Sequence, residues 1–235
     1  GVIISSKNES ELAGVMAHEI THVTQRHLAR QFEQASQYSL VNTAALIGAI
    51  LIGISNPEAG MAAMTGAAGL SAQNSANFTR ANEQEADRIG MQVLVSSGFN
   101  PRGMPEFFET LQQIGRYSQS AAPEFARTHP LTTSRIADTR ARAEEYPKGE
   151  YTNSHSYDLI RYKLLVASAK SPKEAAIFLR KALNESKSSV KEDLPIRYGL
   201  AYAYISTREF APARQQVDHL LKDNPDDIAY LLLAA

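Results

Sequence analysis

Two histidines four residues apart, with a glutamate directly after the first, constrain this chain more than any other feature. In His18-Glu19-Ile20-Thr21-His22, the two imidazoles lie about one turn apart on one face of a helix. Two imidazoles in this arrangement can bind one zinc ion, and Glu19 can take the proton of a water molecule held in an open coordination position. The pattern indicates a zinc hydrolase that cuts peptide bonds. A motif of five residues also arises by chance, so its surroundings have to decide.

The residues around this motif predict a single helix from residue 11 to about 30. Apolar side chains recur there at helical spacing, at Leu12, Val15, Met16, Ile20 and Val23. His27 follows His22 by five positions, off the face that carries the motif, and we interpret it as a polar surface histidine.

A second helix offers the groups that a site with two histidines still needs. Residues 82–88 read Asn-Glu-Gln-Glu-Ala-Asp-Arg and continue into an apolar helical pattern. Glu83 and Asp87 lie on one face, so Glu83 can ligate the metal while Asp87 accepts the spare N–H of a ligating histidine. Glu85 points elsewhere, and we interpret it as a solvated charge. Taken alone, an ordinary acidic helix start explains these residues about as well.

An H-E-x-x-H helix followed by N-E-x-x-A-D resembles the Ste24-type zinc metallopeptidases, the family that includes the CaaX prenyl proteases and the mitochondrial protease Oma. Three stretches carry a closer resemblance to a bacterial branch of this family in which tetratricopeptide repeats follow the zinc domain: residues 18–30, 82–90 and 128–131. The resemblance covers roughly residues 1–145 closely and residues 155–235 by architecture.

The resemblance implies zinc ligation by His18, His22 and Glu83, with Glu19 as the general base. It also implies that His129, in Thr-His-Pro-Leu, lies on a loop over the zinc and acts as a further ligand that holds the enzyme shut. Arg135 follows six residues later. Three roles are open for it: an anchor for that loop, a catalytic group that stabilises the oxyanion, or a plain surface charge.

Composition narrows the classes of protein that remain. The chain has 235 residues, 43% of them hydrophobic, with a formal net charge of -1, as in a globular protein without the basic face that a nucleic-acid partner needs. There is no cysteine, which excludes thiolate zinc sites and disulfides. No signal peptide is visible. Residues 1–4 predict a fragment of strand from a small or truncated sheet, and we expect further residues before Gly1 and after Ala235.

Residues 40–70 form the most apolar part of the chain. The run from 40 to 54 is nearly all apolar but shorter than the ~20 residues of a bilayer span, and small residues follow from 60. We favour a buried helical pair that covers the active-site domain. The alternative is an exposed lid, or a hairpin in peripheral contact with a membrane. The polar residues 71–79 are predicted to be mobile.

A polar stretch rich in Pro and Gly divides the chain. We expect a mostly α fold: a zincin-like metallopeptidase domain at 1–146, a linker at 147–156, and tetratricopeptide-like helical repeats at 157–235. Residues 194–225 fit one repeat, and residues 157–186 fit a looser copy. A plain helical bundle is the alternative for this part.

These patterns together predict a zinc metalloendopeptidase for protein or peptide substrates, with a repeat arm that receives a protein partner or client. Resemblance to the bacterial branch implies periplasmic quality control of outer-membrane proteins, with the β-barrel assembly machinery as a partner. The alternative is a tetratricopeptide chaperone or binding module whose zinc site is silent or structural.

Overall fold

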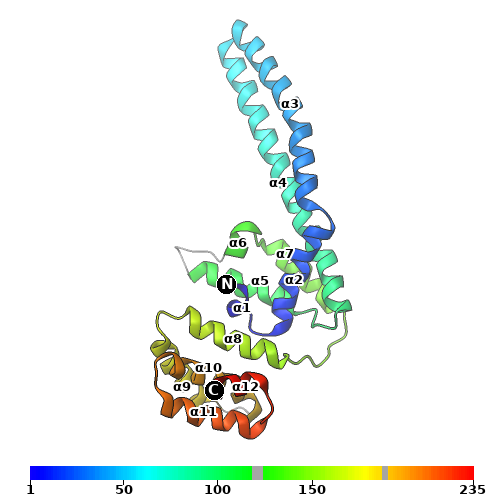
Figure 1. The fold of residues 1–235 in the computed structure, drawn as a ribbon. Coiled ribbons are helices and arrows are strands. Elements are labelled where there is room, and N and C mark those ends of the chain that lie inside the picture. The colour runs from blue at the N-terminus through cyan, green and yellow to red at the C-terminus, as the bar shows by residue number, and fades with distance from the viewer. Residues whose placement is uncertain (118–123, 187–189) are drawn as a thin grey trace. The chain divides into compact units, whose positions relative to one another are not determined.

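The computed structural model describes residues 1–117, 124–186 and 190–235, and all of the regular structure in these ranges is helical (Figure 1). The predicted mostly α fold is confirmed. The strand expected at the start is wrong, because Val2–Ser5 form a short helix, α1. Without a partner strand, the backbone groups of this apolar segment pair locally: the amides of Ser5 and Ser6 donate to the carbonyls of Gly1 and Val2.

The chain folds into two compact units. One unit is Ser10–Tyr151, and the other combines Gly1–Glu9 with Thr152–Ala235. Helices of the first unit are α2 (Glu9–Thr24), α3 (His27–Ser55), α4 (Pro57–Ser96), α5 (Gly103–Tyr117), α6 (Glu124–Thr128) and α7 (Thr133–Glu144). Besides α1, those of the second are α8 (His155–Ser168), α9 (Pro172–Glu185), α10 (Val190–Ser206), α11 (Phe210–Asp223) and α12 (Ile228–Ala234).

Helix α2, which carries the two-histidine motif, is shorter than predicted. It ends at Thr24 because Arg26 adopts a left-handed conformation, with φ of 56° and ψ of 37°, which no continuous α-helix tolerates. The chain changes direction at this residue, and α3 begins at His27. Side chains beyond Arg26 therefore do not lie where a straight helix would have placed them.

Helices α3 and α4 form a long antiparallel hairpin, seen in blue and cyan in Figure 1. Asn56 caps α4 by accepting a hydrogen bond from the amide of Ala59, and Pro57 opens the helix. The buried pair that we favoured is wrong: most apolar side chains from 40 to 70 are exposed, among them Leu46, Ile47, Ile50, Leu51 and Ile54. The polar residues 71–79, which we predicted to be mobile, lie within α4.

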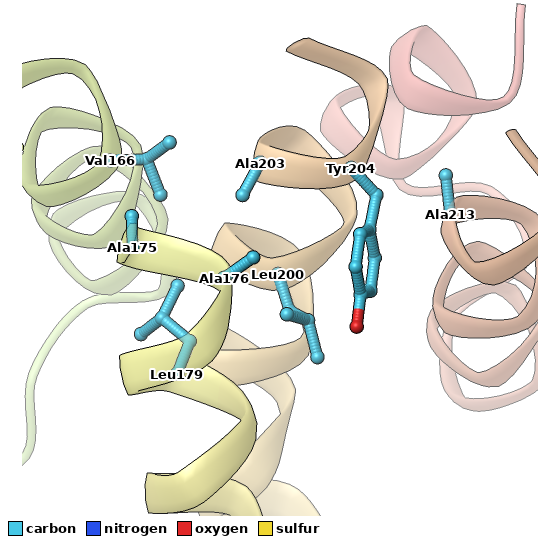
Figure 2. Close-up of a cluster of buried hydrophobic side chains, with 8 residues drawn as sticks. All are labelled: Val166, Ala175, Ala176, Leu179, Leu200, Ala203, Tyr204 and Ala213. Carbon is cyan, nitrogen blue, oxygen red and sulfur yellow. The ribbon is translucent and has the colours of Figure 1, made fainter. Parts of the chain in front are cut away.

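In the second unit, helices that follow one another in the chain pack together: α9 and α11 both lie against α10, and α12 lies against α11. Figure 2 shows one of its cores, in which small residues let the helices approach and Leu179, Leu200 and Tyr204 fill the space between them. The cluster draws on four helices and consists of Val166, Ala175, Ala176, Leu179, Leu200, Ala203, Tyr204 and Ala213. The helical-repeat architecture predicted for this part is confirmed.

Candidate metal centre

Four side chains from three segments converge in the first unit. Helix α2 contributes His18 and His22 one turn apart, α4 contributes Glu83, and His129 follows directly after α6. One potential ligand atom from each lies within 4.8 Å of the others. The Nε2 atoms of the two α2 histidines are 3.0 Å apart, and each lies 3.4–3.5 Å from a carboxylate oxygen of Glu83. All four residues were candidates from the sequence.

His129 connects this cluster to Glu19. Its Nδ1 lies 3.0 Å from Glu83 Oε1 and 3.3 Å from His18 Nε2, while its Nε2 lies 3.2 Å from Glu19 Oε1. The His129 ring stacks on Phe125, with centroids 4.8 Å apart, and its amide donates to the Phe125 carbonyl. Helix α6 thus orients this imidazole. The sequence also predicts a flexible stretch at residues 118–123, before His129, and these residues lie outside the part of the chain that the structure describes.

A close crossing of two helices sets the distance between the histidines and Glu83. Gly90 of α4 lies against the α2 backbone at Ala17 and His18, where an added Cβ would come within 3.1–3.2 Å of backbone atoms. A larger side chain there would move α4 away from α2. Glu83, two turns before Gly90, is consequently held next to the histidines.

Asp87 and Arg135 form a buried clamp behind the cluster. Asp87 Oδ1 lies 2.9 Å from His18 Nδ1, the position expected for a carboxylate that orients a ligating imidazole. Arg135 donates through Nε and Nη2 to Asp87, and through Nη1 to Glu83 Oε2 and to the Pro130 carbonyl. Most of its five donors are therefore engaged inside the protein. This arrangement supports the anchoring role over the oxyanion role, and it excludes a surface charge because Arg135 is buried.

His27 and Glu85 are not where the sequence placed them. His27 is only 3% exposed, so its interpretation as a surface histidine is wrong. Its Nδ1 lies 2.8 Å from His22 Nδ1, and its Nε2 lies 3.2 Å from Glu85 Oε2. Glu85 also pairs with Arg30, so it is not a free solvated charge. Both interpretations are wrong for one reason: the sequence predicted a continuous helix through Arg26, whereas the helix ends before this residue.

The electrostatic environment of the cluster favours an ionised carboxylate at Glu83 and a neutral imidazole at His22. Burial opposes the charge of Glu83, but hydrogen bonds from His129 and His18 and the charge of Arg135 hold its pKa well below the usual range. Burial, reinforced by the His18 charge, lowers the pKa of His22 to about 4. Burial also lowers the pKa of His18. The hydrogen bonds and negative charges of Asp87 and Glu83 outweigh this effect, so the pKa of the His18 imidazole is raised overall. At neutral pH Glu83 is ionised and His22 is neutral, the forms that bind metals.

The donor set fits a metal ion. Asp87 and His27 lie at the Nδ1 atoms of His18 and His22, so both imidazoles can turn an Nε2 lone pair toward the anionic Glu83. Lone pairs that converge with a carboxylate repel one another unless a cation lies between them. A cleft of about 830 Å³ opens beside the cluster and is lined by residues including Glu19, His22, Glu83 and His129. The cluster therefore borders a cleft of the protein rather than a closed core.

Comparison with known proteins agrees with this geometry. The family model "Peptidase family M48" matches residues 1–143, and a tetratricopeptide repeat model matches residues 167–235. The beta-barrel assembly-enhancing protease of Escherichia coli (strain K12) is 41% identical over 230 residues, which are 97% of this chain and 46% of that protein. The putative protein of that name from Vibrio cholerae serotype O1 is 40% identical over 233 residues, 98% and 47% of the two chains.

A more distant relative matches a shorter part of the chain. The mitochondrial metalloendopeptidase OMA1 of Arabidopsis thaliana is 28% identical over 130 residues, 55% of this chain and 24% of that protein. The chain spans about half the length of the bacterial relatives described above. With a family model over more than half of its residues, the chain belongs to peptidase family M48.

Proposed function

We propose that this protein is a zinc-dependent metalloendopeptidase that hydrolyses peptide bonds of protein substrates. The convergence of His18, His22 and Glu83 beside Glu19 carries the proposal. Ligand atoms ~2.0–2.2 Å from a tetrahedral zinc are about 3.3–3.6 Å apart. The nitrogen and oxygen atoms of the four candidate ligands that face one another are 3.0–3.5 Å apart. Two or three imidazoles and one carboxylate are also a common zinc ligand set in enzymes.

The protein's own residues complete the reaction. Zinc, when bound, polarises the scissile carbonyl and lowers the pKa of water. The Glu19 carboxylate accepts the proton of the attacking water and later donates it to the leaving amine. Asp87 keeps a proton on His18 Nδ1, so that Nε2 remains the ligand atom, and Arg135 holds Asp87 and Glu83 in place.

His129 closes the site in this account. Its Nδ1 lies among the ligand atoms, and its Nε2 lies on Glu19. Four protein ligands are typical of a closed zinc site, whereas catalysis needs an open position. Movement of His129 off the cluster would open that position and release Glu19 in the same step.

The names of the bacterial relatives suggest the substrates. We propose a role in the periplasm, in quality control of misassembled outer-membrane β-barrel proteins, with the β-barrel assembly machinery as partner and the repeat unit as the surface that receives client or partner. Exposed faces of stacked helical repeats commonly bind proteins.

An unfolded β-barrel protein and an unfolded soluble protein, offered together to the full-length protein, test this function. We expect preferential cleavage of the β-barrel chain, loss of cleavage with a chelator, and recovery with one equivalent of zinc. Equal cleavage of both chains would contradict the substrate class. No cleavage, combined with protection of the β-barrel chain from aggregation, would favour a chaperone with a silent zinc site.

We also propose that the α3–α4 hairpin makes peripheral contact with a membrane. Its exposed apolar side chains point in several directions around α3, and no charged residue lies between Glu33 and Glu58 or between Glu58 and Arg80. Among the described residues, α3 is the one helix long and apolar enough to cross a membrane, although core helices and signal sequences share that composition. An uncharged lipid interior suits such a surface, whereas a protein groove would cover only one side.

Flotation with vesicles of neutral phosphatidylcholine tests the contact. The full-length protein should float with the vesicles even at high salt, and the Ile47→Glu/Leu51→Glu variant should remain in solution. Leu231→Glu, which charges a similarly exposed position on α12, serves as the control and should float. If the wild type stays in solution with vesicles but forms dimers without them, the hairpin contacts a second copy instead.

A further inference from the structure

We propose that His27 and Glu85 are positioning residues that fix the orientation and tautomer of His22, through hydrogen bonds that run from the Glu85 carboxylate through the His27 imidazole. The proposal rests on the metal site proposed above and assigns two residues to it that lie outside the ligand set. Neither residue touches the candidate metal position, so both would act through His22.

The contacts run in series from Glu85 to His27 and from His27 to His22. Glu85 Oε2 lies 3.2 Å from His27 Nε2, and His27 Nδ1 lies 2.8 Å from His22 Nδ1. The two rings meet nearly at right angles, at 85°, with centroids 4.6 Å apart. At the far side of His22, Nε2 faces His18 and Glu83. Each ring therefore uses one nitrogen toward the cluster and the other toward Glu85.

Only one proton arrangement suits a metal ligand. Between the two Nδ1 atoms, one must carry a hydrogen and the other a lone pair. If His22 presents its Nε2 lone pair to the metal, its hydrogen is on Nδ1 and is donated to His27 Nδ1. Neutral His27 then carries its own hydrogen on Nε2 and donates it to the Glu85 carboxylate. The opposite arrangement would put a hydrogen on His22 Nε2, where the metal belongs.

Burial and a counter-charge keep this series of contacts in place. His27 is buried at the start of α3, so solvent does not compete strongly for its ring nitrogens. Arg30, one turn later on α3, pairs with the same Glu85 oxygen that accepts from His27. The left-handed Arg26 aims His27 back at α2. A left-handed residue other than glycine is sparsely populated, and such residues are concentrated at functional sites.

The two α2 histidines would thus be oriented by two different routes. Asp87 contacts His18 directly, whereas a carboxylate at Glu85 reaches His22 only through His27. Loss of a partner that orients a metal ligand typically lowers metal affinity about 10- to 100-fold. His27→Leu removes the acceptor with little change in volume and should show a loss of this size. His27→Asn keeps an oxygen acceptor near the Nδ1 position but loses the contact of Nε2 with Glu85, so its zinc affinity should lie between those of His27→Leu and the wild type.

Zinc affinity of the full-length variants, measured by competition with a chromogenic chelator, tests the inference without any assay of cleavage. His155→Leu is the matched control, because it breaks the His155–Asp227 pair in the other unit and should leave zinc affinity unchanged. Thermal unfolding of each variant in chelator shows whether the fold survives. In the zinc-loaded wild type, the nitrogen NMR signals of His22 should show the hydrogen on Nδ1.

Each outcome has a separate meaning. Wild-type affinity in His27→Leu would overturn the inference. Equal losses in His27→Leu and His27→Asn would also overturn it, since packing rather than the hydrogen-bond acceptor would then matter. A wild-type protein that binds no zinc would instead contradict the proposed function.

Discussion

Glu19→Gln is expected to abolish peptide cleavage while it leaves the fold and zinc binding intact. Only the carboxylate that accepts the proton of water is lost, and an amide of the same shape cannot replace it at neutral pH. General base catalysis contributes about 10²- to 10⁴-fold, so the turnover number should fall by at least this factor. The Glu19 side chain is 43% exposed at the edge of the cleft, so its replacement should change stability little.

Turnover of an unfolded protein at equal zinc occupancy checks this expectation. Glu33→Gln is a matched control, because it makes the same chemical change at an exposed position of α3. Unchanged turnover in Glu19→Gln would rule out Glu19 as the base. Loss of bound zinc in this variant would show that Glu19 contributes to the metal site rather than to proton transfer.

His129→Ala is expected to retain zinc and to cleave faster than the wild type. The substitution removes a nitrogen from the ligand cluster and frees Glu19 from its contact with His129 Nε2. A hydrogen bond to a charged group contributes about 1.5–3 kcal/mol, so its loss should raise the population of the open site about 10- to 150-fold. Cleavage of a disordered substrate should rise accordingly, and self-cleavage should become visible during storage.

An exposed histidine provides the control for this variant. His219→Ala, in the repeat unit, should cleave at the wild-type rate. Slower cleavage by His129→Ala at equal zinc occupancy would contradict the closed-site account. It would mean that His129 takes part in the reaction, for example by binding the oxyanion.

The part of the site that the sequence predicted rests on spacing within helices. Residues four apart share a helix face whatever the rest of the fold does, so His18 with His22, and Glu83 with Asp87, could be paired directly. Contact between these two pairs and His129 came from the family resemblance. Patterns of apolar residues likewise predicted the repeat helices, and the structure contains them.

The predictions that the structure contradicts depend on helix boundaries and on tertiary packing, which local sequence patterns do not determine. His27 was misplaced because nothing in the local sequence marks Arg26 as left-handed. The apolar run at 40–54 predicted burial, but α3 and α4 extend beyond the other helices of their unit, and only each other's surface is available to cover them there. For α1, local helical hydrogen bonds replaced the strand pairing that an apolar segment suggested.

The most direct test of the central claim is the position of zinc in a crystal structure of the zinc-loaded protein. We predict one zinc ion per chain, within ~2.0–2.2 Å of His18 Nε2, His22 Nε2 and a Glu83 oxygen. His129 should occupy the fourth position in the resting protein. A zinc ion bound by the two histidines but more than ~4 Å from Glu83 would contradict the account, because no zinc–oxygen bond spans that distance.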